Sequence, residues 1–221
     1  MTLQDQTLGQ LARQIPGATH IFHEFDLDFC CGGKITLREA AQQKGLEADA
    51  IGARLAALKA EREPGDRDWG TASPSELIDH ILVRFHDRHR EQLPELARLA
   101  RRVETVHGDR PDCPAGLADH LDAMRQELES HMQKEEQVLF PMIKGGMGPM
   151  AGGPIQVMRM EHDGHGEALQ HLAELTNNIT LPQGACNTWR ALYVGLRALR
   201  EDLMEHIHLE NNILFENAEH A

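Results

Sequence analysis

Residues 130–142 read SHMQKEEQVLFPM, and a related stretch, HIHLENNILF, occupies residues 206–215. Both contain the pattern His-x-x-x-Glu-x-x-(Val/Ile)-Leu-Phe. On an α-helix a step of four residues advances by roughly 400°, so the histidine and the glutamate of each stretch project from one face about a turn apart. Apolar residues continue that face after each glutamate, which indicates that the face is turned inward.

This repeated pair of side chains predicts a metal site. A single His-x-x-x-Glu motif is common on solvated helices, where such a pair contributes only about 0.2–0.5 kcal/mol. Two buried copies instead require a compensating positive charge, and 14 histidines in 221 residues point the same way. The pattern predicts a binuclear centre in which Glu135 and Glu210 each bridge both ions, beside His131 and His206.

The bulk composition restricts the partners that the chain can have. A net charge of −13 opposes binding to nucleic acid and to anionic membrane surfaces. No apolar run reaches the length of a membrane span, and the first residues lack the pattern of a signal peptide. Four cysteines, two of them adjacent, suit a reducing compartment. We therefore expect a soluble, cytoplasmic protein that binds no nucleic acid and no membrane.

Three regions are expected along the chain: a small helical domain over residues 1–60, a charged linker over 61–72, and a larger helical domain over 73–221. Apolar residues at helical spacings predict three or four short helices in the first region. Between them lies the sequence DFCCGG, in which Cys30 and Cys31 are too close in the chain for an unstrained disulfide. Their thiols are either exposed for metal binding, exchange or oxidation, or buried as small hydrophobic groups.

Four long helices are expected after the linker. The first begins with Ser73 as N-cap and Glu76 as the capping-box acid, and the others cover about 115–144, 154–176 and 188–218. The glycine-rich segment 145–153 is expected to be a connection rather than a lid. Short connections predict an all-α, antiparallel four-helix bundle with its site between facing helices.

The apolar stripes leave two ligand choices open. On the first long helix His86 and His89 both follow the stripe, and on the third helix His162 and His165 compete in the same way. Periodicity alone does not choose between the members of either pair.

The motifs DFCCGG, IDHILVRFHDRHREQLPEL, HMQKEEQVLFPMI, MEHDGH and EHIHLENNILF follow one another along the chain. In this order they resemble the iron-sulfur cluster repair di-iron proteins, also called the RIC or YtfE type, over essentially the whole length. The resemblance implies a cysteine-bearing N-terminal domain joined to a hemerythrin-like four-helix bundle. It also implies two non-haem iron ions per chain, joined by an oxo or hydroxo bridge.

The same resemblance implies the residues of the site. Carried over motif by motif, the metal ligands are His86, His131, Glu135, His162, His206 and Glu210. Glu127, four residues before His131, and Glu161, beside His162, are candidates for positions near the ligands or on a path of iron transfer. The alternative is that both are ordinary exposed acids. Cys30 and Cys31 are expected to act outside the iron site, in transfer or in contact with a partner.

The function that the resemblance implies is a stress response. The protein is expected to repair iron-sulfur clusters damaged by nitrosative or oxidative stress by donating iron to damaged or apo iron-sulfur proteins. Two alternatives stay open: an enzyme that reduces nitric oxide to nitrous oxide, and an oxygen or redox sensor. All three need a di-iron site that nitric oxide or oxygen can reach. A second copy of the chain, in a homodimer, is a further expected partner.

Overall fold

The computed structural model describes residues 2–15, 17–30, 32–60 and 69–220. Cys31 and most of the expected linker, residues 61–68, lie outside the described residues. Within them the secondary structure is helical, and the bridge between Thr7 and Thr36 is the sole β-type pairing. The all-α prediction is therefore confirmed. None of the described helices is long and apolar enough to cross a membrane.

The chain divides into two compact units. The first, here the terminal unit, comprises Met1–Ile78, Ile143–Gly152 and Met204–Ala221. The second, here the bundle unit, comprises Asp79–Met142 and Gly153–Leu203. The expected domain boundaries at 60 and 73 stay a prediction.

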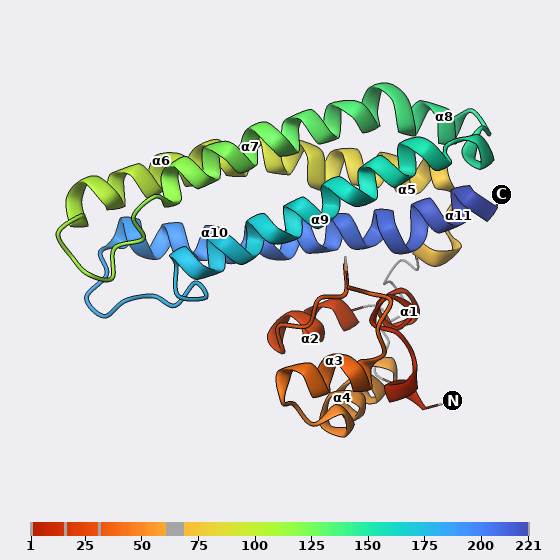
Figure 1. Ribbon diagram of the computed structural model, residues 1–221, viewed down its shortest axis with the longest axis horizontal. Coiled ribbons are helices and arrows are strands. Elements are labelled where there is room, and N and C mark those ends of the chain that lie inside the picture. Colours follow the sequence, from red (N-terminus) through yellow and green to blue (C-terminus); the bar gives the residue numbers. More distant parts are fainter. Residues whose placement is uncertain (1, 16, 31, 61–68, 221) are drawn as a thin grey trace. The chain divides into compact units, whose positions relative to one another are not determined.

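Four long helical segments run in alternating directions, as predicted (Figure 1). The first consists of α5 (Pro74–Ile81), η3 (Leu82–His86) and α6 (Asp87–His107). The second consists of α7 (Leu117–Lys134), η4 (Glu135–Leu139) and α8 (Phe140–Lys144). The third is α9 (Gly152–Leu175), and the fourth consists of α10 (Asn187–Leu209), η6 (Glu210–Leu214) and α11 (Phe215–His220).

Local capping and apolar burial explain why these helices form. The amide of Glu76 donates to Oγ of Ser73, and the amide of Ser73 donates to Oε2 of Glu76, so the predicted capping box is present. In the bundle unit Leu121, Leu192 and Leu196 are fully buried. Each such side chain contributes roughly 1.5–3 kcal/mol relative to an exposed one.

In the terminal unit the N-terminal residues form four short helices: α1 (Leu8–Gln14), α2 (Ala18–Glu24), α3 (Leu37–Lys44) and α4 (Ala48–Ala60). Thr7 and Thr36 each begin a helix with a capping box, the pattern that satisfies two orphan amides at once. Leu8, Phe22 and Leu55 are fully buried between these helices.

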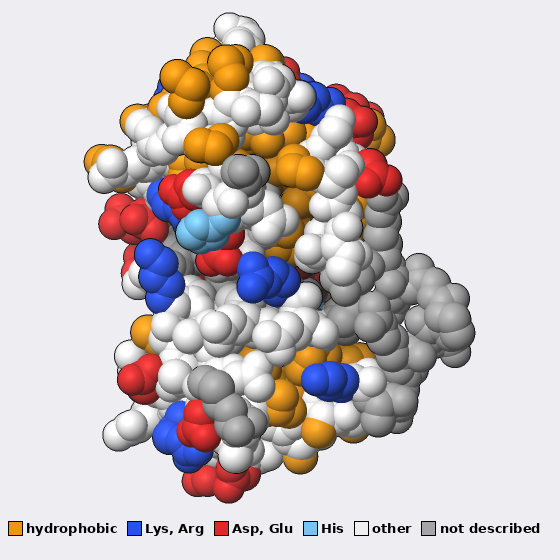
Figure 2. Space-filling model, turned by 90° about the vertical axis from the view of Figure 1, so that its right-hand side faces the viewer, with side chains coloured by type: hydrophobic (Ala, Val, Ile, Leu, Met, Phe, Trp, Pro, Cys, Tyr) orange, Lys and Arg blue, Asp and Glu red, His pale blue; other side chains and the backbone are white. Residues whose placement is uncertain are grey.

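The glycine-rich connection between α8 and α9 contains η5 (Gly148–Met150) and also belongs to the terminal unit. Gly148 is packed against α11, because a Cβ atom there would lie 2.7 Å from the carbonyl oxygen of Ala218. This close contact favours the predicted connection over a lid. Met147 and Met150 are 44% and 77% exposed. The face of the molecule drawn in Figure 2 shows hydrophobic side chains gathered in its upper part.

Candidate metal centre

Three helical segments change their hydrogen-bond pattern at a predicted ligand. The five-residue π-helical segment η3 ends at His86, while η4 begins at Glu135 and η6 begins at Glu210. Such π turns are rare and occur often at functional sites. Hydrophobic periodicity did not predict them, because the backbone stays helical on both sides. In two of these segments an apolar side chain faces outward, since Val83 is 72% and Val138 is 50% exposed.

The bundle unit supplies four of the predicted ligands, and each is at most 1% exposed. Glu135 lies between two imidazoles: its Oε2 is 3.4 Å from Nε2 of His86 and 3.4 Å from Nε2 of His131. Nε2 of His162 lies 3.1 Å from Nε2 of His131. Four donor atoms from three helical segments therefore converge within this unit.

The terminal unit supplies the other two predicted ligands. His206 stands near the end of α10 and Glu210 begins η6, and both are at most 1% exposed. Nε2 of His206 lies 3.1 Å from Oε1 of Glu210, so the four-residue spacing places both side chains on one face as predicted.

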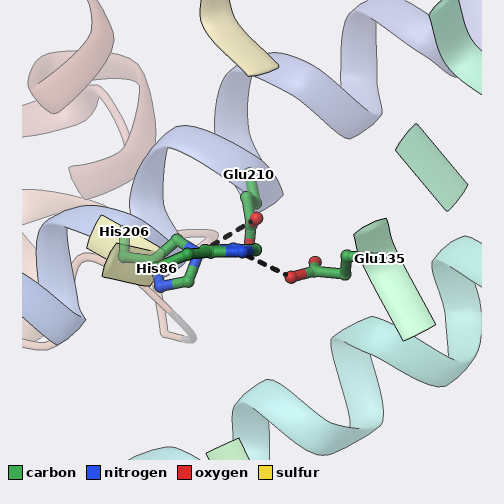
Figure 3. Close-up of side chains that lie close together, drawn as sticks. All are labelled: His86, Glu135, His206 and Glu210. Atoms are coloured by element: carbon green, nitrogen blue, oxygen red, sulfur yellow. Dashed lines mark hydrogen bonds and ion pairs between the residues drawn. The ribbon is translucent and has the colours of Figure 1, made fainter. Parts of the chain in front are cut away.

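The six residues form two groups that share both glutamates. One group contains His86, Glu135, His206 and Glu210 (Figure 3), and the other contains His131, Glu135, His162 and Glu210. Within each group the ligand atoms lie within 4.8 Å of one another. Each group thus combines two imidazoles with the same two carboxylates, the composition that a binuclear centre with shared carboxylates requires.

The chemistry of these donors fits non-haem iron. Both groups offer nitrogen and oxygen atoms and no sulfur, which suits first-row metals in hard to intermediate coordination. Glu135 and Glu210 are fully buried, and an ionised carboxylate in that position costs several kcal/mol unless a charge or hydrogen bonds compensate it. A metal cation held by these carboxylates would supply that compensation.

A carboxylate and an arginine hold the outer side of His86. Nδ1 of His86 donates to Oε1 of Glu136 at 2.8 Å, and Nη2 of Arg90 donates to the same oxygen at 2.9 Å. Hydrogen bonds to Glu129 and Glu136 raise the pKa of Arg90 above its usual value. Because Nδ1 carries the proton in this arrangement, the lone pair of Nε2 is directed to the ligand group.

His131 has a corresponding partner on α9. Nδ1 of His131 donates to Oε2 of Glu161 at 2.9 Å, and the other carboxylate oxygen of Glu161 accepts from Nζ of Lys134. Glu161 was expected either near the ligands or on a transfer path, and its observed contact is with a ligand. Glu127 is exposed on α7 and belongs to neither group.

Sequence reasoning missed Glu136 as a partner of His86. The sequence does contain a feature that could have indicated this partner, because a second acid, Glu136, directly follows the predicted ligand Glu135. The two acids point to different atoms because Glu135 approaches Nε2 of His86, whereas Glu136 accepts from Nδ1.

His89 and His165, the alternative ligand candidates on the first and third long helices, belong to neither group. His89 is fully buried, with its ring 6.4 Å from that of Phe85. His165 is 5% exposed and stands edge-on to His131, with ring centroids 4.9 Å apart. The groups contain His86 and His162 instead. That these two histidines bind metal, which the family resemblance implied, stays a prediction.

The Cys30 loop is anchored to η6 within the terminal unit. Nδ2 of Asn211 donates to the carbonyl oxygen of Cys30 at 3.2 Å, and Nδ2 of Asn212 donates to that of Phe29 at 3.3 Å. Cys30 is 5% exposed, and its thiol donates to Oδ1 of Asp28 at 3.3 Å. Cys30 was expected to be either an exposed, reactive thiol or a small buried group, and the structure shows it buried.

His208 lies beside this loop and is in neither ligand group. Burial, assisted by the positive charge of Arg13, lowers the pKa of His208 to about 3. The imidazole is therefore neutral, and its Nδ1 accepts from Nδ2 of Asn212 at 3.0 Å. Its ring packs edge-on against Phe29, with centroids 5.7 Å apart.

Comparison with known proteins shows the family of the chain. Residues 77–218 match the hemerythrin HHE cation binding domain, and residues 4–59 match a domain of unknown function, DUF542. The chain is 56% identical to the iron-sulfur cluster repair protein YtfE of Citrobacter koseri and 55% identical to those of Dickeya chrysanthemi and Escherichia coli O81. Each match spans 218 residues, 99% of this chain and 98% of the relative. The chain therefore belongs to the family of YtfE-type iron-sulfur cluster repair proteins, with a hemerythrin HHE domain.

Proposed function

We propose that this protein repairs damaged iron-sulfur clusters by supplying iron from a buried di-iron centre. The six ligands of this proposal are His86, His131, Glu135, His162, His206 and Glu210. The observation that supports it most directly is that two ligand groups share Glu135 and Glu210. Two non-haem iron ions per chain, with an oxo or hydroxo bridge, are part of the proposal, and the name of the relatives supplies the repair role.

A di-iron pair in this position supplies exchangeable metal together with redox chemistry. The chain's own contribution is mainly electrostatic. The four imidazoles are neutral donors, so the attraction that the site exerts on a cation comes chiefly from Glu135 and Glu210 and increases with the charge of that cation. Reduction of the iron lowers the positive charge of the cations that these carboxylates bind. We therefore expect iron to leave more readily from the reduced protein.

The deciding experiment follows labelled iron. The loaded protein is mixed with an apo iron-sulfur protein, in oxidised and in reduced form, and the label is measured in both proteins over time. The expected result is transfer to the acceptor, with a higher rate from the reduced protein. A Glu91→Gln variant is the matched control, because Glu91 is an exposed carboxylate on α6 that belongs to neither group.

The same mixture tests the enzyme alternative. Nitric oxide is added to the reduced, loaded protein, and nitrous oxide and retained iron are measured together. If both iron ions stay bound through many turnovers of nitric oxide, donation is wrong and the reductase takes its place.

A further inference from the structure

We infer that the two metal positions are unequal, and that the metal held by His131 and His162 leaves before the metal held by His86 and His206. This inference rests on the proposed di-iron centre and adds which ion is donated. Glu135 and Glu210 belong to both groups, so they cannot distinguish the two positions. The two positions differ in the side chains behind His86 and His131.

The arginine support, defined here as Glu136, Arg90 and Glu129, stands behind His86. Arg90 donates through Nη2 to Glu136 at 2.9 Å, and through Nε and Nη2 to Glu129 at 2.9 and 3.2 Å. Gln133 donates to Glu129 at 3.0 Å. The guanidinium is a planar, pre-organised fork, so it fixes both carboxylates and thereby the ring of His86.

The lysine support, defined here as Glu161 and Lys134, stands behind His131. Glu161 accepts from Nδ1 of His131 and from Nζ of Lys134. The ammonium group of Lys134 sits on a flexible four-carbon stem, and this side chain is 46% exposed, against 33% for Arg90. Water competes with such an exposed single-point contact, so it orients its carboxylate less firmly than the arginine fork does.

Partners behind a metal-binding imidazole matter for the metal itself. They fix the orientation and basicity of the ring, and changing one typically alters metal affinity by roughly 10- to 100-fold. The weaker support is expected to make release from the His131 and His162 position roughly tenfold faster, the lower end of that range.

The two possible roles of Glu161, holding His131 or transferring iron, predict opposite changes in the rate of iron release. If Glu161 carried iron out of the site, neutralising it would slow release. If it holds His131, as its hydrogen bond indicates, neutralising it speeds release.

The test uses the full chain loaded anaerobically with Fe(II) and diluted into a coloured Fe(II) chelator. Two phases of release are expected in the wild type. Glu161→Gln should speed the fast phase roughly tenfold and leave the slow phase unchanged, and Glu136→Gln should speed the slow phase alone. Glu167→Gln is the control, because Glu167 is an exposed carboxylate on the same helix as Glu161.

Three further variants distinguish the proposed effect on iron release from a general folding defect. Lys134→Arg replaces the single-point contact by a fork and should slow the fast phase, a change that partial unfolding would not produce. His162→Ala should abolish the fast phase and His206→Ala the slow one, with iron content and circular dichroism measured for each.

Four outcomes overturn the inference: release of both ions in one phase, a fast phase that persists in His162→Ala, slower release from Glu161→Gln, or acceleration of the same phase by Glu161→Gln and Glu136→Gln. Each of these leaves iron donation intact. A wild-type protein that binds no iron would instead contradict the proposed function.

Discussion

Replacing Glu135 by leucine should change the stability of the metal-free and the metal-loaded protein in opposite directions. This carboxylate is fully buried, with Oε2 3.4 Å from two imidazole nitrogens. Replacing buried ionic groups by apolar ones of similar volume is often neutral or stabilising by about 1–4 kcal/mol, as long as no unpaired charge is left behind. An imidazole partner meets this condition because it becomes neutral by releasing a proton. At roughly 3 °C per kcal/mol for a chain of this length, Tm of metal-free Glu135→Leu should rise by up to about 12 °C.

The metal-loaded protein should respond in the opposite sense. Glu135 belongs to both ligand groups, so its removal weakens both positions at once. Metal at about 1,000 times its Kd stabilises a folded protein by about 4 kcal/mol, which corresponds to roughly 12 °C on the same scale. Glu135→Leu should lose most of this increase, and its iron content should fall below two ions per chain.

The assay is thermal unfolding followed by circular dichroism, with and without Fe(II), together with iron analysis of the same samples. Glu91→Gln is the control for removal of a carboxylate, since its side chain is 75% exposed on α6. Two retained iron ions per chain in Glu135→Leu would refute the assignment of a shared ligand. A metal-free variant that melts well below the wild type would refute the argument from burial.

Two further predictions concern the terminal unit and the helix backbone. Cys30→Ser/Cys31→Ser should keep its iron and its visible spectrum, because the ligand groups found among the described residues contain no sulfur; loss of the spectrum would make the cysteines ligands. Gly33→Ala should lower the free energy of unfolding by about 1–3 kcal/mol, since a Cβ atom there would lie 2.5 Å from the backbone carbonyl oxygen of Phe29. Gly164→Ala, in open space within α9, should raise it by about 0.5–1 kcal/mol, and shifts of the same sign in denaturant titrations would contradict this reasoning.

Several features of this protein could be predicted from local sequence because their causes are local. The capping box of Ser73 and Glu76 depends on residues three apart, and the pairing of His206 with Glu210 depends on one helical turn. The four-helix architecture followed from apolar periodicity and short connections, which each helix carries in its own residues.

The choice within each histidine pair needed more than periodicity. His86 and His89 are both buried on one helical segment, as are His162 and His165. The family resemblance chose His86 and His162, and the tertiary structure gives a physical reason for the first choice. The π-helical segment η3 ends at His86 and changes the rotation of the helix there, while His89 packs near Phe85.

Tertiary structure alone decided which side chains stand behind the ligands and where Cys30 lies. Glu136 reaches His86 across 50 residues of sequence, and Asn211 reaches the carbonyl of Cys30 across 181. Such contacts depend on the packing of separate helices, and no pattern within a single helix encodes which distant residue will lie opposite. The residues themselves therefore indicate a site of imidazoles and carboxylates, whereas its unequal supports arise because helix packing places an arginine behind one histidine and a lysine behind the other.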